Sequence, residues 1–296
     1  MLSLKLLRRR IAGVRSTQQI TRAMYMVSAA RLKRAHDRIL NARPYADKIK
    51  EMIQDLWERA KKPYHPLMER RKLERVVVFI MSTEKGLCGS YNVNLFREVE
   101  RFMAEAPFEV QLDILGRKGW DYFRRRYPQL IRRTYVDQFK RFDYEVAKKL
   151  AQPLMEDFLR EEVDGVFLAY NFFRSPLSQI PTIERLLPLE IPAEEEEFPV
   201  GEVIIFPVEP IYEPPPQELF ARLLPRYVEM SVFRALLEHN AGEHGARMTA
   251  MDNATKNAQE LIEKLTLLYN KARQASITKE VTEIATTAEA LKAQVK

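Results

Sequence analysis

Apolar side chains recur at helical spacing through the first sixty residues. Within each of three sets they step by three or four positions, as in a coiled-coil heptad, and the register slips between sets. We expect Pro44 to bend or restart the helix and "KKPYHP" (61–66) to end it. This pattern predicts an N-terminal coiled-coil helix over residues 1–62. The sets are Leu4, Leu7, Ile11 and Val14; Ile20, Met24 and Val27; and Leu32, Ala35, Ile39 and Ala42.

The period changes between residues 74 and 207. Short runs rich in β-branched residues, typical of buried strands, alternate here with longer helix-like stretches. Such alternation favours an α/β domain with a mainly parallel, Rossmann-like sheet. The expected strands are 75–81, 108–115, 164–173 and 203–206, and the expected helices are 92–106, 119–127 and 143–162. The acidic, proline-flanked "PAEEEEFPVGE" (192–202) reads as a solvated surface loop.

After "EPIYEPPP" (209–216) the helical period returns, and we expect a second coiled-coil helix over 217–296, with a restart near Pro225. Its apolar and small positions step regularly by three and four, then jump by two residues and continue. The first set is Met251, Ala254, Ala258, Leu261, Leu265, Leu268, Ala272 and Ala275; the second is Ile277, Val281, Ile284, Ala288 and Leu291.

These two helices are too long to fold onto the middle domain. A helix of about 70 residues is about 100 Å long, whereas an α/β domain of about 130 residues is about 35–40 Å across. Each helix therefore needs another partner along its length. The simplest architecture is a two-helix rod made of both terminal segments, with the α/β domain inserted between them. The C-terminal helix is the longer, and its last stretch must find a further partner.

Charge is concentrated at the N-terminus. The chain of 296 residues has a formal net charge of +7, and residues 1–43 contain eleven Lys or Arg against one acid, Asp37. Such a segment suits nucleic acid, anionic lipid or an acidic protein surface, or is simply a solvated face. It is also basic and amphipathic in the manner of a mitochondrial presequence. The heptads already run from Leu4, however, which favours a place in the folded protein.

Chemistry for catalysis or metal binding is sparse. "STEKGLCGSYN" (82–92) follows a strand and opens a helix, as phosphate loops do, but it matches no phosphate-loop motif and reads better as a tight turn. Cys88 is the single cysteine, which excludes an internal disulfide. The histidines are scattered without metal-ligand spacing. We therefore expect no catalytic residue, no metal and no cofactor, and the arginine runs at 8–10 and 124–126 lack a nucleic-acid motif.

Three stretches resemble one known family. "RIAGVRSTQQITRAMYMVSAARLKRA" (10–35), "GLCGSYN" (86–92) and "ARMTAMDNATKNAQELIEKLTLLYNKARQASITKEVTEI" (246–284) are similar, in order and spacing, to the signatures of the gamma subunit of F-type ATP synthases. The resemblance implies an antiparallel, left-handed coiled coil with an inserted α/β domain. It implies a non-catalytic central shaft that turns with the membrane ring as protons flow and drives conformational changes at the catalytic beta subunits. The two-cysteine segment of the chloroplast type is missing, and Thr286 and Thr287 stand where many relatives carry glycine-containing sequence.

Partners and contact residues follow from the same resemblance. The implied partners are three alpha and three beta subunits, the epsilon subunit and the membrane ring of c subunits. Met24, Arg273 and Gln274 match positions that contact beta subunits. A basic cluster and two residues of the stalk base are expected at beta loops or the c ring; they are Arg31, Lys33, Arg34 and Arg38, and Tyr212 and Glu213.

The resemblance places the chain as a peripheral protein on the cytoplasmic face of a bacterial inner membrane. Its longest aliphatic run, 76–81, is too short to cross a bilayer. One alternative is a scaffold protein that homodimerises through the same heptad stripes. A basic nucleic-acid-binding protein and an α/β enzyme with helical arms are others, but none of the three explains the C-terminal signature.

Overall fold

A computed structural model describes residues 4–60, 64–139, 141–190 and 212–294. They divide into two compact units, 1–28 with 247–296, and 29–246. The helices α1 (Leu4–Arg59) and α5 (Pro216–Gln294) each contribute to both units. The boundaries between the two compact units fall within these two long helices.

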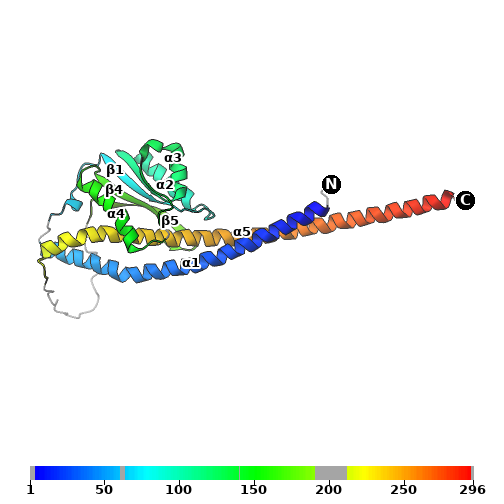
Figure 1. Cartoon of the computed structure of the whole chain (residues 1–296), viewed down its shortest axis with the longest axis horizontal. Coiled ribbons are helices and arrows are strands. Elements are labelled where there is room, and N and C mark those ends of the chain that lie inside the picture. The colour runs from blue at the N-terminus through cyan, green and yellow to red at the C-terminus, as the bar shows by residue number, and fades with distance from the viewer. Residues whose placement is uncertain (1–3, 61–63, 140, 191–211, 295–296) are drawn as a thin grey trace, which may run out of the picture. The chain divides into compact units, whose positions relative to one another are not determined.

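A five-stranded sheet organises the unit formed by 29–246 (Figure 1). Its strands lie in the order β3-β2-β1-β4-β5. The strands β3, β2, β1 and β4 are parallel to one another, and β5 pairs antiparallel with β4. The order β3-β2-β1-β4 is that of half a doubly wound Rossmann sheet, so the predicted fold class is confirmed. The strands are β1 (Arg75–Met81), β2 (Glu109–Leu115), β3 (Ile131–Tyr135), β4 (Gly165–Ser175) and β5 (Ser178–Leu187).

Helices cover both faces of the sheet. The even-numbered residues of β1 pack against α2 (Tyr91–Glu105) and α3 (Arg117–Arg126). Its odd-numbered residues face α4 (Tyr144–Leu159) and parts of α1 and α5. Because both faces are buried, β1 is a continuous apolar run, as is usual for parallel strands. Two short 3₁₀ turns, Pro66–Met68 (η1) and Pro128–Leu130 (η2), complete the unit.

Three predicted strands and all three predicted helices are present, and two strands were missed. The strand β3, "IRRTY", is a short edge with every side chain half-buried, so it has no apolar run to mark it. The other edge strand, β5, contains Pro181, which sequence rules set against a strand but which an edge tolerates. The expected strand 203–206 and acidic loop 192–202 lie outside the described residues.

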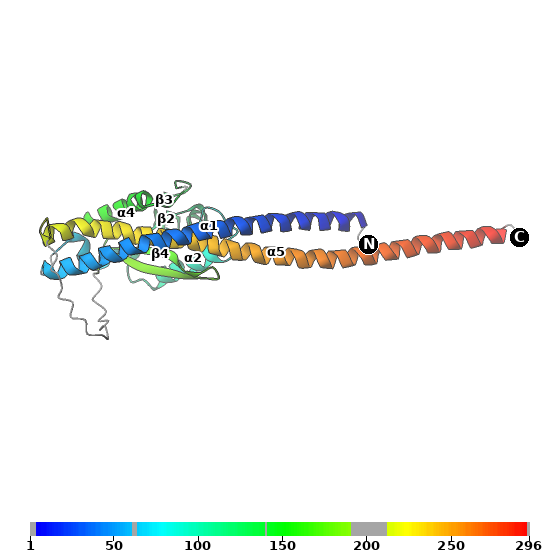
Figure 2. The same ribbon diagram turned by 90° about the horizontal axis from the view of Figure 1, so that it is seen from below.

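In the unit formed by 29–246, α1 and α5 pack antiparallel. Ile49, Ile53 and Leu56 share one buried cluster with Phe220 and the helix that follows it. The Trp57 and Phe220 rings lie 5.7 Å apart. Figure 2 shows these stretches side by side, coloured cyan and yellow. Both helices continue through their prolines, Pro44 and Pro225, so the expected restarts are absent.

The register slip predicted for α1 is also absent. One regular heptad stripe runs through the helix, and it includes polar positions that the sequence reading passed over: Gln18, Thr21 and Ser28. Ile20 and Val27, which we expected to face inward, are 58% and 52% exposed. Hydrogen bonds to the facing helix allow Gln18 and Thr21 to occupy the stripe, as described below. The full stripe is Leu7, Val14, Thr21, Ser28, Ala35, Ala42, Ile49 and Leu56, with Leu4, Ile11, Gln18, Leu32, Ile39, Ala46 and Ile53 beside it.

A similar correction applies to α5. Met251, Ala258, Leu265 and Ala272 lie on the inner face as predicted, but Leu261 and Leu268 are exposed. Thr255, Ile262 and Tyr269 take the inward positions instead. Half of the inner positions are therefore displaced by one residue from the prediction, which leaves Leu261 and Leu268 on the outer surface. Sequence periodicity alone cannot distinguish these stripes, because both have the same seven-residue repeat.

Candidate partner-binding surfaces

In the unit formed by 1–28 and 247–296, the two helices meet along a seam with a polar centre. Gln18 donates to Gln259 at 2.8 Å, and Thr255 donates to Thr21 at 2.8 Å. The partner numbers descend along α5 as they rise along α1, so the pairing is antiparallel. At the outer end of the seam, Arg8 donates to the Tyr269 hydroxyl at 2.7 Å. Polar pairs of this kind fix which residues of a coiled coil face each other.

A shallow groove follows one flank of this seam. Its volume is about 380 Å³, and it combines an apolar floor with two guanidinium groups. The groove was not anticipated, although the i, i+3, i+4, i+7 spacing of its α1 residues is visible in the sequence. Its lining residues are Arg8, Ile11, Ala12, Arg15, Ser16, Gln19 and Tyr269.

Met24 lies at the edge of the seam and is half-buried. The helix around it exposes Ile20, Met26 and Val27, which are 58%, 56% and 52% accessible. Exposed apolar side chains that cluster on one stretch of a helix are typical of a protein interface. Met24 therefore lies within an apolar surface, as a beta-contacting position requires.

The four basic residues Arg31, Lys33, Arg34 and Arg38 are all exposed. They alternate with the buried Leu32 and Ala35, so the helix itself turns them away from the core. Arg34 donates to its own helix at the Ala30 carbonyl, and within the described residues none of the four forms an ion pair. Their positive charges are therefore available to an acidic partner surface.

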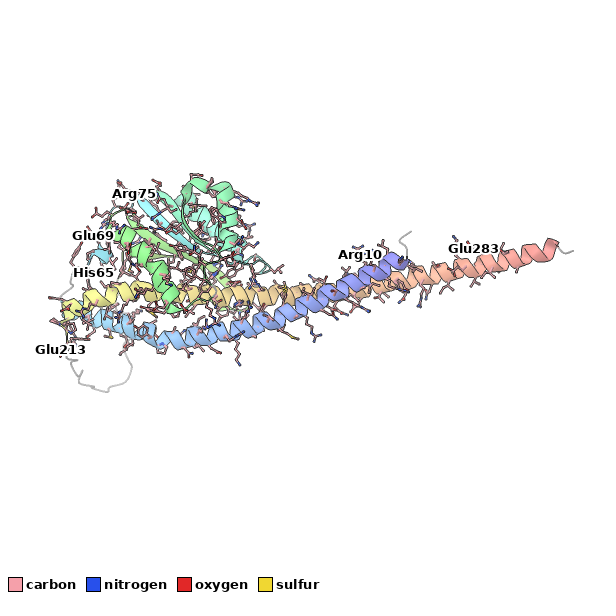
Figure 3. The ribbon with its side chains drawn as sticks, viewed as in Figure 1. Arg10, His65, Glu69, Arg75, Glu213 and Glu283 are labelled. Carbon is pink, nitrogen blue, oxygen red and sulfur yellow. The ribbon has the colours of Figure 1, made fainter. Side chains whose placement is uncertain are left out.

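Beyond the seam, α5 continues without a covering helix in its own unit. Arg273 and Gln274 are exposed, and every described side chain from Ile277 to Ala288 is exposed as well. Ile277, Val281 and Ile284 recur on one face, and they are 51%, 60% and 70% accessible. Figure 3 labels Glu283 in this stretch and Arg10 near the start of α1. A long helix that exposes an apolar stripe is stable only when another protein surface covers it.

Tyr212 and Glu213, the two residues predicted for the stalk base, differ in their surroundings. Tyr212 is half-buried, and its hydroxyl donates to Asp55 on α1 while its ring lies 5.9 Å from the Arg59 guanidinium. Burial and the Asp55 carboxylate raise the pKa of the Tyr212 phenol. Glu213 is exposed just before α5 begins (Figure 3). Tyr212 thus ties α1 to the start of α5, whereas Glu213 is free to meet a partner.

The backbone N–H groups at the start of α3 are occupied by side chains and carbonyls of the neighbouring loop that follows β1. The carboxylate of Glu84 accepts from the backbone N–H of Arg117 at 3.0 Å and of Asp137 at 2.8 Å. The next amides at the start of α3 donate to the Thr83 carbonyl and the Ser82 hydroxyl. A phosphate at the start of α3 would need these same donors. Within residues 82–92, the Thr83 hydroxyl donates to the Lys85 carbonyl at 2.8 Å and the Thr83 N–H donates to the Asn92 side chain at 3.2 Å, as in a tight turn.

The crevice between the carboxyl ends of β1 and β4 is closed as well. Ligands of doubly wound sheets bind at this switch point. Here Tyr91, at the start of α2, is buried, and its hydroxyl donates to the His239 carbonyl of α5 at 2.9 Å. Asn171 of β4 donates to the Tyr91 carbonyl. Cys88 is buried beside Tyr91.

Metal clusters and membrane-spanning helices are both absent from the described residues. No group of three or more His, Cys, Asp or Glu side chains in the described ranges is arranged to hold a metal ion. None of the helices in these ranges has a stretch long and apolar enough to cross a membrane.

Taken together, the structure defines a class of protein: two long, antiparallel helices with an inserted doubly wound sheet, in which helix surfaces rather than a pocket carry the accessible chemistry. Within this class, the chain belongs to the ATP synthase gamma-chain family, since the family model described as ATP synthase matches residues 3–291.

Relatives named ATP synthase gamma chain support this assignment over nearly the whole length. The protein of Anaeromyxobacter sp. (strain Fw109-5) is 47% identical over 98% of this chain and 99% of its own. That of Geotalea daltonii is 44% identical over 99% and 100%, and that of Moorella thermoacetica is 44% identical over 97% and 98%.

Solved structures show the same fold. A chain of the central stalk and c ring of the Tetrahymena thermophila mitochondrial ATP synthase matches with a TM-score of 0.61 and 25% identity, over 79% of this chain and 99% of its own. A chain of the Euglena gracilis mitochondrial enzyme has a TM-score of 0.68 and 19% identity, over 99% and 96%. The comparisons give no support to a homodimeric scaffold.

Proposed function

We propose that this chain is the central rotor shaft of a bacterial F-type ATP synthase. In this role it couples rotation of the membrane c ring, driven by proton flow, to conformational changes in the catalytic beta subunits. The observation that carries the proposal is the match to gamma chains from end to end, together with the exposed apolar stripe on the last part of α5. A stripe without a covering helix in its own unit is what a shaft inside a sleeve of other subunits needs.

The subunit itself is non-catalytic in this proposal. Glu84 occupies backbone N–H groups at the start of α3, and the Tyr91–His239 contact closes the crevice between β1 and β4. The proposed partners are three alpha and three beta subunits, epsilon and the c ring. As part of that assembly the chain lies on the cytoplasmic face of the bacterial inner membrane, as a peripheral protein.

Contact roles are proposed for the exposed groups described above. Arg273, Gln274 and Met24 would contact beta subunits. The basic cluster of Arg31, Lys33, Arg34 and Arg38 would meet acidic beta loops or the ring, and Glu213 would face the ring beside Tyr212. Small and uncharged residues on α5 would allow close contact without buried ion pairs, whose rupture at every step would cost several kcal/mol.

Native mass spectrometry of this chain coexpressed with alpha and beta subunits tests the proposal. The expected complex contains one copy of this chain with three copies of each partner. A stable homodimer that leaves alpha and beta unbound would refute the proposed shaft function and favour the alternative of a homodimeric coiled-coil scaffold. Coexpression of alpha and beta without this chain provides the control.

A further inference from the structure

Four charged side chains meet beneath α4, on the side of the sheet opposite α2. Asp113 comes from β2, Arg132 and Arg133 from β3, and Asp157 from α4. Asp113 is 0% exposed and Asp157 is 3% exposed. Charges removed this far from water must be compensated by partners inside the protein.

Three of the four are joined by ion pairs, although Nη1 of Arg132 is buried without a hydrogen-bond partner among the described residues. Asp157 accepts from Arg133 through both guanidinium nitrogens, at 2.5 and 2.9 Å, and it also accepts from Arg132. The two arginines hold the pKa of the Asp157 carboxyl below its ordinary value despite its burial. This cluster ties α4 to the edge strand β3.

Asp113 is the exception. Neither of its carboxylate oxygens has a hydrogen-bond partner among the described residues. The nearest cation is Nη1 of Arg133 at 3.7 Å, and that guanidinium is already committed to Asp157. Two carboxylates therefore share one arginine, and only one of them is hydrogen-bonded.

Burial disfavours the charged form of an acid. It raises the pKa of Asp113 to about 6, with a smaller contribution from the like charge of Asp157. Arg132, Arg133 and the Arg133 main chain offset part of this rise. Tyr135 is the other titratable group beside Asp113, and its pKa is raised above its ordinary value of 10.0, so it does not titrate near neutrality.

We propose that Asp113 is a proton-binding site that sets how tightly α4 is held on the sheet. In the ionised form, Asp113 repels Asp157 and competes with it for Arg133. In the protonated form, the repulsion disappears and Arg133 is left to Asp157. Acidification toward pH 5 should therefore tighten the contact of α4 with β3. This inference concerns the α/β domain and is independent of the proposed rotor function.

The size of the effect follows from proton linkage. When α4 opens, Asp113 meets water and its pKa returns toward 3.8, whereas in the closed state it is about 6. Between these two pKa values the closed state thus binds more protons than the open state. The stabilisation that this proton binding gives the closed state is lost as the pH rises through about 6. Between about pH 7.5 and about pH 5, the closed-to-open ratio should rise by about tenfold.

Amide hydrogen exchange of the full-length chain at both pH values tests the proposal, after correction for intrinsic exchange rates. Peptides of α4 are compared with peptides of α2, which covers the other face of the sheet. The expected result is about a tenfold gain in protection of α4 relative to α2 at the lower pH. An unchanged ratio would overturn the proposal.

Asp113→Asn assigns the effect to this side chain, since Asn has the shape of the protonated acid. Its α4 should be as protected at about pH 7.5 as the wild type is at about pH 5, with no further response to pH. Asp143→Asn changes the exposed N-cap of the same helix and should keep the tenfold response. His65 caps η1, which packs against α4, and burial lowers its pKa, so its protonation acts in the opposite direction, toward loss of protection. A gain in protection of α4 on acidification that persists in Asp113→Asn would contradict the proposal; if this variant does not fold, the wild-type measurement decides alone.

Discussion

Single residues show where backbone geometry, rather than side-chain chemistry, constrains this chain. Gly116 ends β2 with a φ of 92°. A Cβ built there would lie 2.1 Å from the Ser82 carbonyl oxygen. Gly13, by contrast, lies within α1, and a Cβ built on it would meet nothing within 4 Å. Substitution by alanine is therefore expected to have opposite effects on stability at these two glycines.

Gly116→Ala should destabilise the protein by at least about 2 kcal/mol, because both the positive φ and the close carbonyl exclude a side chain. Gly13→Ala should stabilise it by about 0.5–1 kcal/mol, since alanine is the better helix former. The free energy of unfolding, measured by urea titration followed by circular dichroism, checks both values. Equal effects of the two substitutions would contradict this account.

His65 gives stability a second pH dependence. Its Nδ1 accepts from the Leu67 N–H at 3.1 Å, which caps η1 and requires an unprotonated nitrogen. Burial lowers the pKa of His65 below its ordinary value of 6.5. Protonation therefore favours the unfolded chain, and the contribution of His65 is intact above pH 6.5 and lost as the pH falls toward the folded-state pKa.

In His65→Asn the side-chain oxygen keeps the cap without a titrating group. The wild type should lose free energy of unfolding relative to this variant as the pH is lowered from about 8 to about 5. Urea titrations across this range measure the difference between the two proteins. A difference that does not change with pH would show that His65 is not the group responsible.

Among the elements, the seam of the two long helices distinguishes residues that look equivalent in the sequence. Leu265 is 5% exposed and Leu267 is 70% exposed, although both belong to the same leucine-rich stretch. Their difference in burial follows from which face of α5 meets α1. The seam should therefore respond very differently to loss of each leucine.

Leu265→Ala should cost about 2–4 kcal/mol, through lost burial and the cavity left behind. Leu267→Ala should change stability by no more than about 0.5 kcal/mol. Thermal unfolding of the full-length chain, compared side by side for the two variants, provides the measurement. A larger loss in Leu267→Ala would mean that the helix is rotated from the orientation described.

The same elements show what sequence reasoning reached and what it did not. Strand β1 was predicted at its observed bounds, because a strand buried on both faces is a run of apolar residues. On α5, half of the predicted inner positions lie one residue from the observed ones. The prediction chose Leu261 and Leu268 because they fit a heptad as well as the buried positions Ile262 and Tyr269 do. Only the packing of the two helices separates these alternatives.

For the candidate surfaces, the structure shows that the predicted contact residues are exposed but not what they contact. Arg273, Gln274 and the basic cluster are exposed, as contact residues must be, and their partners remain a prediction. Ion pairs between residues that are far apart in the sequence could not be predicted from residue spacing. Asp113, Arg133 and Asp157 come from three different elements, and nothing in their spacing signals that they meet.

At the scale of the whole molecule, function depends on what the exposed end of α5 touches in the assembly. Arg273→Ala combined with Gln274→Ala should lower coupled ATP turnover severalfold, because both groups are exposed and bond to nothing that holds this chain together in the described structure. Assembly with alpha and beta subunits should be intact. Turnover and native mass spectrometry of the reconstituted complex measure the two properties.

Lys264→Ala, earlier on the same helix, removes a cation from a stretch that is paired with α1 and should leave turnover near the wild-type value. Unchanged turnover in the double variant would remove Arg273 and Gln274 from the contact set. Equal losses in all variants would point to a general effect of charge.

The Glu84 carboxylate has a consequence for how this sheet behaves in a cell. A doubly wound domain that binds a soluble phosphate ligand gains stability that rises and falls with the ligand's concentration. Here the anion at the ends of β1 and β2 is part of the chain, so its local concentration never changes. The stabilisation that Glu84 gives the backbone N–H groups of Arg117 and Asp137 is therefore the same whatever the phosphate concentration in the cell.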